Sequence, residues 1–184
     1  MRPWQVLRSR VLVDRQPWLR LIEQDVRLSN GHIIEGYLLA ASREYAMTFA
    51  LTTEGRVPLV RQYKHGVNGP SYDLPAGYLD LGEEPLTCAR RELLEETGYV
   101  ADEWRHLTSA VLDTNRGNAR AHLFLARGAR RVAAPHLDDT EDLVTEFPTP
   151  AELLAMVRSR EIDSMPSVAC VMLALDALNS EGKR

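Results

Sequence analysis

The stretch GYLDLGEEPLTCARRELLEETGY, residues 77–99, places three glutamates within five positions, at Glu92, Glu95 and Glu96. On a helix this i, i+3, i+4 spacing projects all three side chains from one side. Uncompensated carboxylates this close together repel one another. A divalent hard cation removes the repulsion, because Mg²⁺ takes oxygen ligands and is typically held by one or two carboxylates together with substrate phosphates. The plain alternative is a solvated acidic helix face, since charge runs usually lie at the surface.

Residues at each end of this stretch define the helix. It is predicted to begin near Glu84 or Pro85, because proline suits the first helical position and acids suit the positive end of the helix dipole. Gly98 suits the C-terminal cap. An apolar stripe at helical spacing supports the assignment and consists of Leu86, Ala89 and Leu93.

Composition restricts the class of protein. The chain has 184 residues, about the size of one domain, and a formal net charge of −4. This acidity weakens a nucleic-acid or anionic-membrane role, because both favour a basic surface. The two cysteines, Cys88 and Cys170, form no CxxC pair and indicate a reducing compartment. Because the sequence shows no signal peptide and no apolar run of membrane-spanning length, we expect a cytoplasmic protein.

Apolar–polar alternation predicts strands through most of the first 63 residues. The alternating runs within residues 5–28 are expected to form a small β element outside the main core, and Ser29-Asn30-Gly31 is a turn signal. Residues 64–76 are rich in glycine and proline and are predicted to form a loop. Further strands are predicted around RHLTSAVL, RAHLFLA and DLVTEF.

Two helices are predicted near the end of the chain. Thr149 and Glu152 form a capping box around Pro150, so AELLAMVRSRE is expected to be helical. A last helix covers about Pro166–Asn179. Strands and helices without regular βαβ alternation predict a mixed α/β sandwich.

The opening stretch resembles the Nudix box, Gx5Ex7REUxEExGU, in which U is a bulky aliphatic residue. The matching positions are Gly77, Glu83, Arg91, Glu92, Leu93, Glu95, Glu96 and Gly98. A chance match at one start site has a probability on the order of 10⁻⁹ with average residue usage. The last position departs from the pattern, because Tyr99 is aromatic. The resemblance implies a single Nudix hydrolase domain over residues 1–184, an α/β/α sandwich with a mixed sheet and an additional N-terminal β element over residues 1–40.

The resemblance also implies site roles. Glu92 and Glu96 would be the main ligands of Mg²⁺, with Mn²⁺ as an alternative, and the backbone carbonyl of Ala76 would be another ligand. Glu95 would be a further ligand or a partner of Arg91, whose role would be pairing within the catalytic loop and helix. Glu83 would touch a metal or hold the loop. The implied reaction is metal-assisted attack of water on the phosphorus of a nucleoside diphosphate linked to another moiety.

The flanking stretches VPLVRQYKHGV and SYDLPAGYLDLGEEP resemble the branch of ADP-ribose and nucleotide-sugar pyrophosphatases. That resemblance implies a homodimer with the N-terminal β element at the interface. Arg61 would face the substrate phosphates or form a surface salt bridge, and Trp18 would stack on the base or pack. Asp73 stands where many ADP-ribose enzymes carry an acid. ADP-ribose is the expected substrate, with GDP-mannose or another nucleotide sugar as the alternative.

The general base is expected in the acidic stretch PHLDDTEDLVTEF, because relatives in this branch supply such an acid from a loop after the box. Glu141 is the first choice, followed by Asp139 and Asp138, and the alternative is an ordinary solvated acidic loop. A non-catalytic Nudix module that senses a ligand is the main alternative of a different class. The intact box acids argue against it.

Overall fold

The computed structural model describes residues 2–117, 119–137 and 142–181. The chain divides into two compact units, which we describe separately. The first consists of Met1–Glu44 with Ala110–Arg120, and the second of Tyr45–Ser109 with Ala121–Arg184.

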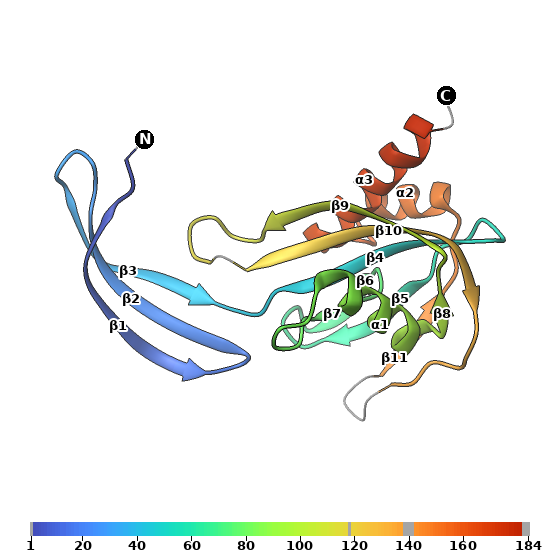
Figure 1. Ribbon diagram of the computed structural model, residues 1–184, viewed down its shortest axis with the longest axis horizontal. Helices are drawn as coiled ribbons and strands as arrows, with labels where there is room; N and C mark the ends of the chain where they lie inside the picture. Colours follow the sequence, from blue (N-terminus) through green and yellow to red (C-terminus); the bar gives the residue numbers. More distant parts are fainter. Residues whose placement is uncertain (1, 118, 138–141, 182–184) are drawn as a thin grey trace. The chain divides into compact units, whose positions relative to one another are not determined.

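The first unit is built on a three-stranded antiparallel sheet, here called the N-terminal sheet (Figure 1). Its strands are β1 (Gln5–Arg15), β2 (Leu19–Arg27) and β3 (Ile33–Ala41), in that order. The predicted turn between β2 and β3 is present, with Gly31 at φ 88 and a Gly31 N–H hydrogen bond to Leu28 O. All residues of β1 are exposed, so this strand buries little of its apolar surface in the chain.

The second unit contains a mixed sheet with strand order β7-β4-β10-β8, and β9 also pairs with β10. Its central strands β4 (Tyr45–Thr52) and β10 (Arg120–Arg131) run parallel. The strands around them are β7 (Ala76–Tyr78), β8 (Tyr99–Val100) and β9 (Glu103–Val111). β7 lies antiparallel to β4, and this pairing fixes the chain segment that faces the glutamate-rich helix.

A second sheet in this unit has the order β11-β5-β6, and both of its strand pairs are antiparallel. Its strands are β5 (Leu59–Lys64), β6 (Gly69–Asp73) and β11 (Leu143–Glu146). The predicted loop over residues 64–76 is therefore wrong in part, because β6 and the first residue of β7 fall within it. Asn68, at φ 53, lies in the turn of the β5–β6 hairpin. Pro70 is tolerated because β6 is an edge strand, where a missing N–H breaks no central ladder.

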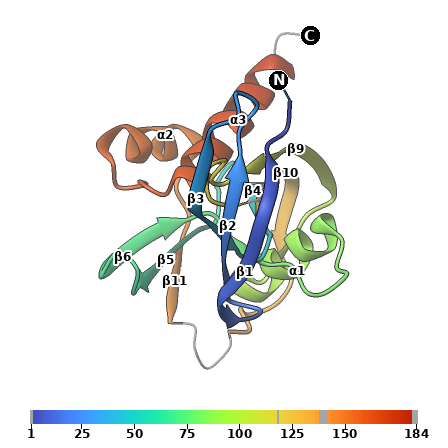
Figure 2. The ribbon, with the colours of Figure 1, turned by 90° about the vertical axis from the view of Figure 1, so that its left-hand side faces the viewer.

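Helices cover both faces of the mixed sheet (Figures 1 and 2). They are α1 (Pro85–Thr97), α2 (Pro150–Ser159) and α3 (Met165–Glu181). Alternation along β10 divides the core: Leu123 and Leu125 pack with residues of α2 and α3, whereas Phe124 and Ala126 lie in the clusters that include α1. This arrangement confirms the predicted α/β/α sandwich.

The predicted ends of α1 and the predicted start of α2 are confirmed. α1 begins at Pro85, and Gly98 caps its C-terminus in the left-handed conformation at φ 76, with its N–H bonded to Leu94 O. The Thr149–Glu152 capping box is present at the start of α2. Within the described residues, no helix combines the length and apolar character needed to cross a membrane.

Candidate active site

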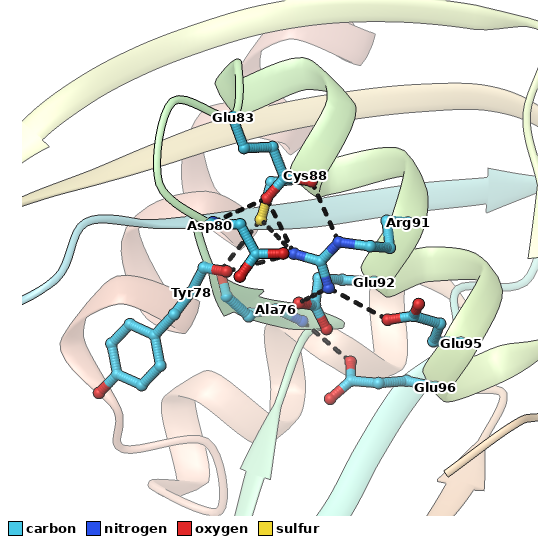
Figure 3. Close-up of polar contacts among 10 residues, drawn as sticks. Ala76, Tyr78, Asp80, Glu83, Cys88, Arg91, Glu92, Glu95 and Glu96 are labelled. Carbon is cyan, nitrogen blue, oxygen red and sulfur yellow. Dashed lines mark hydrogen bonds and ion pairs between the residues drawn. The ribbon is translucent and has the colours of Figure 1, made fainter. Parts of the chain in front are cut away.

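The three glutamates of α1 differ in burial. Glu92 and Glu96 are 8% and 5% exposed, whereas the side chain of Glu95 is 41% exposed. The strand β7 faces them, as Figure 3 shows. Burying two carboxylates is costly unless each is hydrogen-bonded or paired with a charge. The surroundings of this helix face must therefore supply positive charge and N–H donors.

Arg91 supplies most of that charge. Its guanidinium binds Glu83 through two hydrogen bonds of 3.0 Å, and its Nη1 donates to Glu92 at 2.5 Å and to Glu95 at 3.1 Å. A further N–H reaches the carbonyl of Tyr78 at 3.2 Å. The hydrogen bond to Glu83 is the largest effect raising the pKa of Arg91, and in return it is the largest effect lowering the pKa of Glu83. The single Arg91 guanidinium thus donates hydrogen bonds to three carboxylates.

β7 approaches the glutamates through its backbone. The Ala76 N–H donates to Glu96 Oε2 at 2.9 Å. A Cβ at Gly77 would overlap with the Glu92 carboxylate where it now lies, so a side chain at position 77 would force that carboxylate to shift. The pairing of Ala76 with Met47 of β4 holds this segment in place. Backbone and carboxylate oxygens from two elements therefore meet in one small region.

Cys88 lies one turn before Glu92 and is fully buried. Its thiol donates to the carbonyl of Gly77 at 3.3 Å and accepts from Arg91 at 3.4 Å. Burial, followed by the charge of Glu92, raises the pKa of the thiol to about 12. Cys88 therefore stays a neutral thiol at neutral pH and fills space between α1 and β7.

These ligands fit a hard divalent cation, because they are oxygens. The bare backbone at Gly77, here called the Gly77 cradle, leaves room for the Glu92 carboxylate. In the arrangement described, Arg91 and the Ala76 amide bind the carboxylate oxygens. Among the described residues, no three His, Cys, Asp or Glu side chains converge as a ready metal cluster. A bound metal would therefore use carboxylates that these hydrogen bonds already orient, because a carboxylate can accept from an N–H and bind a cation at the same time.

The acidic stretch chosen for the general base lies partly outside the described residues, which exclude Asp138, Asp139 and Glu141. Described residues on each side of these positions contact the end of α1. The His136 N–H donates to the carbonyl of Glu95 at 2.8 Å, and Thr145 Oγ1 donates to the carbonyl of Glu96 at 3.4 Å.

Two of the predicted substrate contacts, Arg61 and Asp73, belong to the same unit as the carboxylates of α1 and can be described with them. Arg61 pairs with Val144, whereas Thr145, which contacts Glu96, pairs with Val60. Since successive strand residues point to opposite faces, the Arg61 side chain lies on the other face of its sheet from Thr145. Its Nε lies 3.7 Å from Glu146 Oε1.

Asp73 and Trp18 have different surroundings. The Asp73 carboxylate accepts hydrogen bonds from Ser71 at 3.1 Å and from Ser167 at 2.8 Å. Trp18 belongs to the first unit, between β1 and β2, and is 68% exposed. Sequence reasoning missed Ser71 and Ser167, because no local motif marks a serine that meets its partner only in the folded chain.

A family model for the NUDIX domain matches residues 42–168. The chain belongs to the NUDIX domain family. This confirms the resemblance found in the box, and the match covers most of the second unit, including all the box residues.

Several relatives of this Nudix chain have names that state an activity. It is 30% identical over 159 residues to the methanol dehydrogenase activator of Bacillus methanolicus, with 85% of each chain covered. It is 31% identical to the ADP-ribose pyrophosphatase of Bacillus subtilis, covering 88% of each. It is 32% identical to the GDP-mannose pyrophosphatase of Salmonella typhimurium, covering 85% of this chain and 87% of the relative.

A solved structure described as an ADP compounds hydrolase superimposes on this Nudix chain with a TM-score of 0.87. The match covers 100% of this chain and 98% of the other, at 20% sequence identity. At that identity the likeness shows a shared fold, including the additional N-terminal β element.

Proposed function

We propose that this Nudix protein is an enzyme that hydrolyses the pyrophosphate bond of a nucleoside diphosphate sugar. ADP-ribose is the first substrate, and its products are AMP and ribose 5-phosphate. The observation that carries the proposal is the set of oxygens at α1 and β7, where Glu92 and Glu96 are buried beside the Ala76–Gly77 backbone. The pyrophosphatase names of relatives at about this chain's full length support it.

The site residues would act as a scaffold for a divalent cation, Mg²⁺ or alternatively Mn²⁺. When bound, the cation neutralises the pyrophosphate, orients it and lowers the pKa of the attacking water. Glu92, Glu96 and the Ala76 carbonyl would be the main ligands, with Glu95 as a further one. Arg91 would keep Glu83 and its neighbours oriented on the helix. Water adds to one phosphorus, the bond to the bridging oxygen breaks, and a general base takes the proton from water.

Glu141 is the proposed general base, with Asp139 and Asp138 as alternatives. The support comes from the flanks of their segment, because His136 and Thr145 both hydrogen-bond to the last turn of α1. These two hydrogen bonds join described residues on each side of the acidic segment to the turn of α1 that carries Glu95 and Glu96. A base must come within hydrogen-bonding distance of the attacking water once substrate is bound.

Recognition of the substrate is proposed to involve Trp18, which is exposed enough to stack on a base. For Arg61, the position on the face away from Thr145 and the proximity of Glu146 support the salt-bridge alternative over a phosphate contact. Exposed ion pairs of this kind contribute little stability.

A homodimer is proposed to form through the N-terminal sheet. Its apolar side chains that remain exposed include Trp4, Val6, Leu7, Val11, Leu12 and Val13. Several exposed apolar residues along one strand favour an interaction site, and two-fold dimers are the commonest oligomers. β1 has one strand partner, so its other edge presents unpaired backbone groups that a second strand can bind.

A panel of nucleotide sugars and dinucleotides with Mg²⁺ tests the function. Added phosphatase releases phosphate from AMP and ribose 5-phosphate but not from intact ADP-ribose, so phosphate reports hydrolysis. We expect the highest kcat/KM for ADP-ribose. A maximum for GDP-mannose would favour the second candidate, which the Salmonella relative supports. If no compound in the panel released phosphate, the proposal would be overturned in favour of a ligand-sensing module.

A further inference from the structure

Ser167 is a fully buried polar residue in the first turn of α3, far from the Nudix box in sequence. Its hydroxyl lies 2.8 Å from Asp73 Oδ1 and 3.7 Å from Met47 Sδ. A hydroxyl has one proton to donate, and the shorter contact to a carboxylate is the stronger bond. The same oxygen accepts the Leu74 N–H at 3.4 Å. Ser167 therefore binds two consecutive residues, Asp73 at the end of β6 and Leu74 directly after it.

Asp73 is held on its second oxygen as well. Ser71, which is 7% exposed, donates to Asp73 Oδ2 at 3.1 Å. Both carboxylate oxygens are thus used within the protein, one by the strand β6 itself and one by α3. Hydrogen bonds to a carboxylate are stronger than those between neutral groups, so this link is stiff.

The segment that follows Asp73 leads directly into the metal site. The carbonyl of Pro75 accepts the Thr48 N–H at 2.9 Å, and the Ala76 N–H donates to Glu96 at 2.9 Å. Gly77 then lies against Glu92. A shift at Asp73 or Leu74 would be passed along this short segment to Ala76 and Gly77.

We propose that Asp73 is a positioning residue rather than a substrate contact. Through Ser167 it fixes the Leu74–Gly77 segment to α3, so that the Ala76 carbonyl and the Gly77 cradle meet the carboxylates of α1. The consequence for metal affinity rests on the function proposed above, but the consequence for the backbone of this segment does not. Partners that orient metal ligands typically change metal affinity by about 10- to 100-fold when removed.

The test compares Ser167→Ala, Asp73→Ala and Asp73→Asn with the control Cys170→Ala. Cys170 lies one turn further along α3, is fully buried and contacts Phe124 instead of Asp73. Its truncation costs core stability without touching the link. The measurements are amide hydrogen exchange of Leu74 and Ala76, Mn²⁺ affinity by titration calorimetry, and KM for ADP-ribose at saturating metal.

We expect Ser167→Ala and Asp73→Ala to accelerate exchange of the two amides and to weaken Mn²⁺ binding by about 10-fold each. The double variant Ser167→Ala with Asp73→Ala should weaken Mn²⁺ binding by less than the product of the two single effects, because the Ser167–Asp73 hydrogen bond is lost in all three. Asp73→Asn keeps an acceptor oxygen and should stay near wild type, as should Cys170→Ala.

Two results would overturn the proposal. In the first, Ser167→Ala leaves exchange and Mn²⁺ affinity at wild-type values while Asp73→Ala raises KM, which makes Asp73 a substrate contact. In the second, Cys170→Ala accelerates exchange as much as Ser167→Ala, which reduces the effect to general destabilisation. If the wild-type protein bound no Mn²⁺, the proposed function would fail, and amide exchange would still decide the positioning role.

Discussion

The backbone of Gly77 lies so close to the carboxylate of Glu92 that any side chain at position 77 would overlap with it. Glu92 cannot easily move aside, because it is 8% exposed and bonded to Arg91. The absence of a side chain at one residue therefore sets the position of a proposed metal ligand.

Gly77→Ala should lower both Mn²⁺ affinity and turnover by about 10- to 100-fold, because the added methyl group displaces the Glu92 carboxylate. Gly66→Ala is the matched control, since a Cβ there meets no atom within 4 Å. Calorimetry and steady-state kinetics measure the two quantities. A Gly77→Ala protein with normal metal affinity would show that Glu92 is not a ligand.

Glu96→Gln should reduce turnover several hundred-fold, which corresponds to about 3–4 kcal/mol of transition-state stabilisation. The free energy of unfolding should change little, because glutamine still offers an oxygen to the Ala76 N–H and one of three crowded charges is removed. Glu84, an exposed glutamate at the opposite end of α1, serves as control through Glu84→Gln. Turnover near that of wild type in Glu96→Gln would remove this residue from the metal site.

Glu83→Gln tests the pH dependence of the link to Arg91. The folded state lowers the pKa of Glu83, so its stabilising contribution is present above the unfolded value of about 4.3 and is lost as pH falls through the folded pKa. We expect a loss of about 1–2 kcal/mol at pH 7 that shrinks below about pH 4. Urea unfolding at several pH values measures it. A loss that stayed constant down to pH 2 would mean that ionisation of Glu83 is not what stabilises the fold.

Glu141→Gln should lower turnover while the dependence on Mg²⁺ concentration stays unchanged, because a base acts on water and not on the metal. Activity should recover in part as pH rises and hydroxide replaces the assisted water. Asp139→Asn is the parallel variant in the same acidic segment. Normal turnover in both would exclude these two acids and leave Glu95 or Asp138 to be tested.

Val11→Arg should convert a dimer into a monomer, because it places a charge on the exposed apolar surface of β1. Val67→Arg adds the same charge at the turn of the β5–β6 hairpin, where the valine is 70% exposed, and should leave the dimer intact. Light scattering at the assay concentration gives the mass of each. A wild-type monomer with full activity would contradict the proposed assembly.

Local sequence patterns predicted much of the fold. The positions of Pro85 and Gly98 predicted the ends of α1, and the Thr149–Glu152 pair predicted the start of α2, because caps and first turns depend on residues only a few positions apart. The β5–β6 hairpin was only half predicted. Glycine and proline in residues 64–76 are typical of loops, but at a sheet edge Pro70 breaks no central hydrogen-bond ladder and the strand forms.

The sequence alone determined that Glu92, Glu95 and Glu96 share one side of a helix, because their spacing matches the helical repeat. Only the tertiary structure decided what surrounds them. It brings Ser167 to Asp73 across 94 positions and puts the Arg61 side chain on the face of its sheet away from Thr145. The physical reason is that helix spacing is set by nearby backbone hydrogen bonds, whereas contacts between distant elements depend on how the whole core packs.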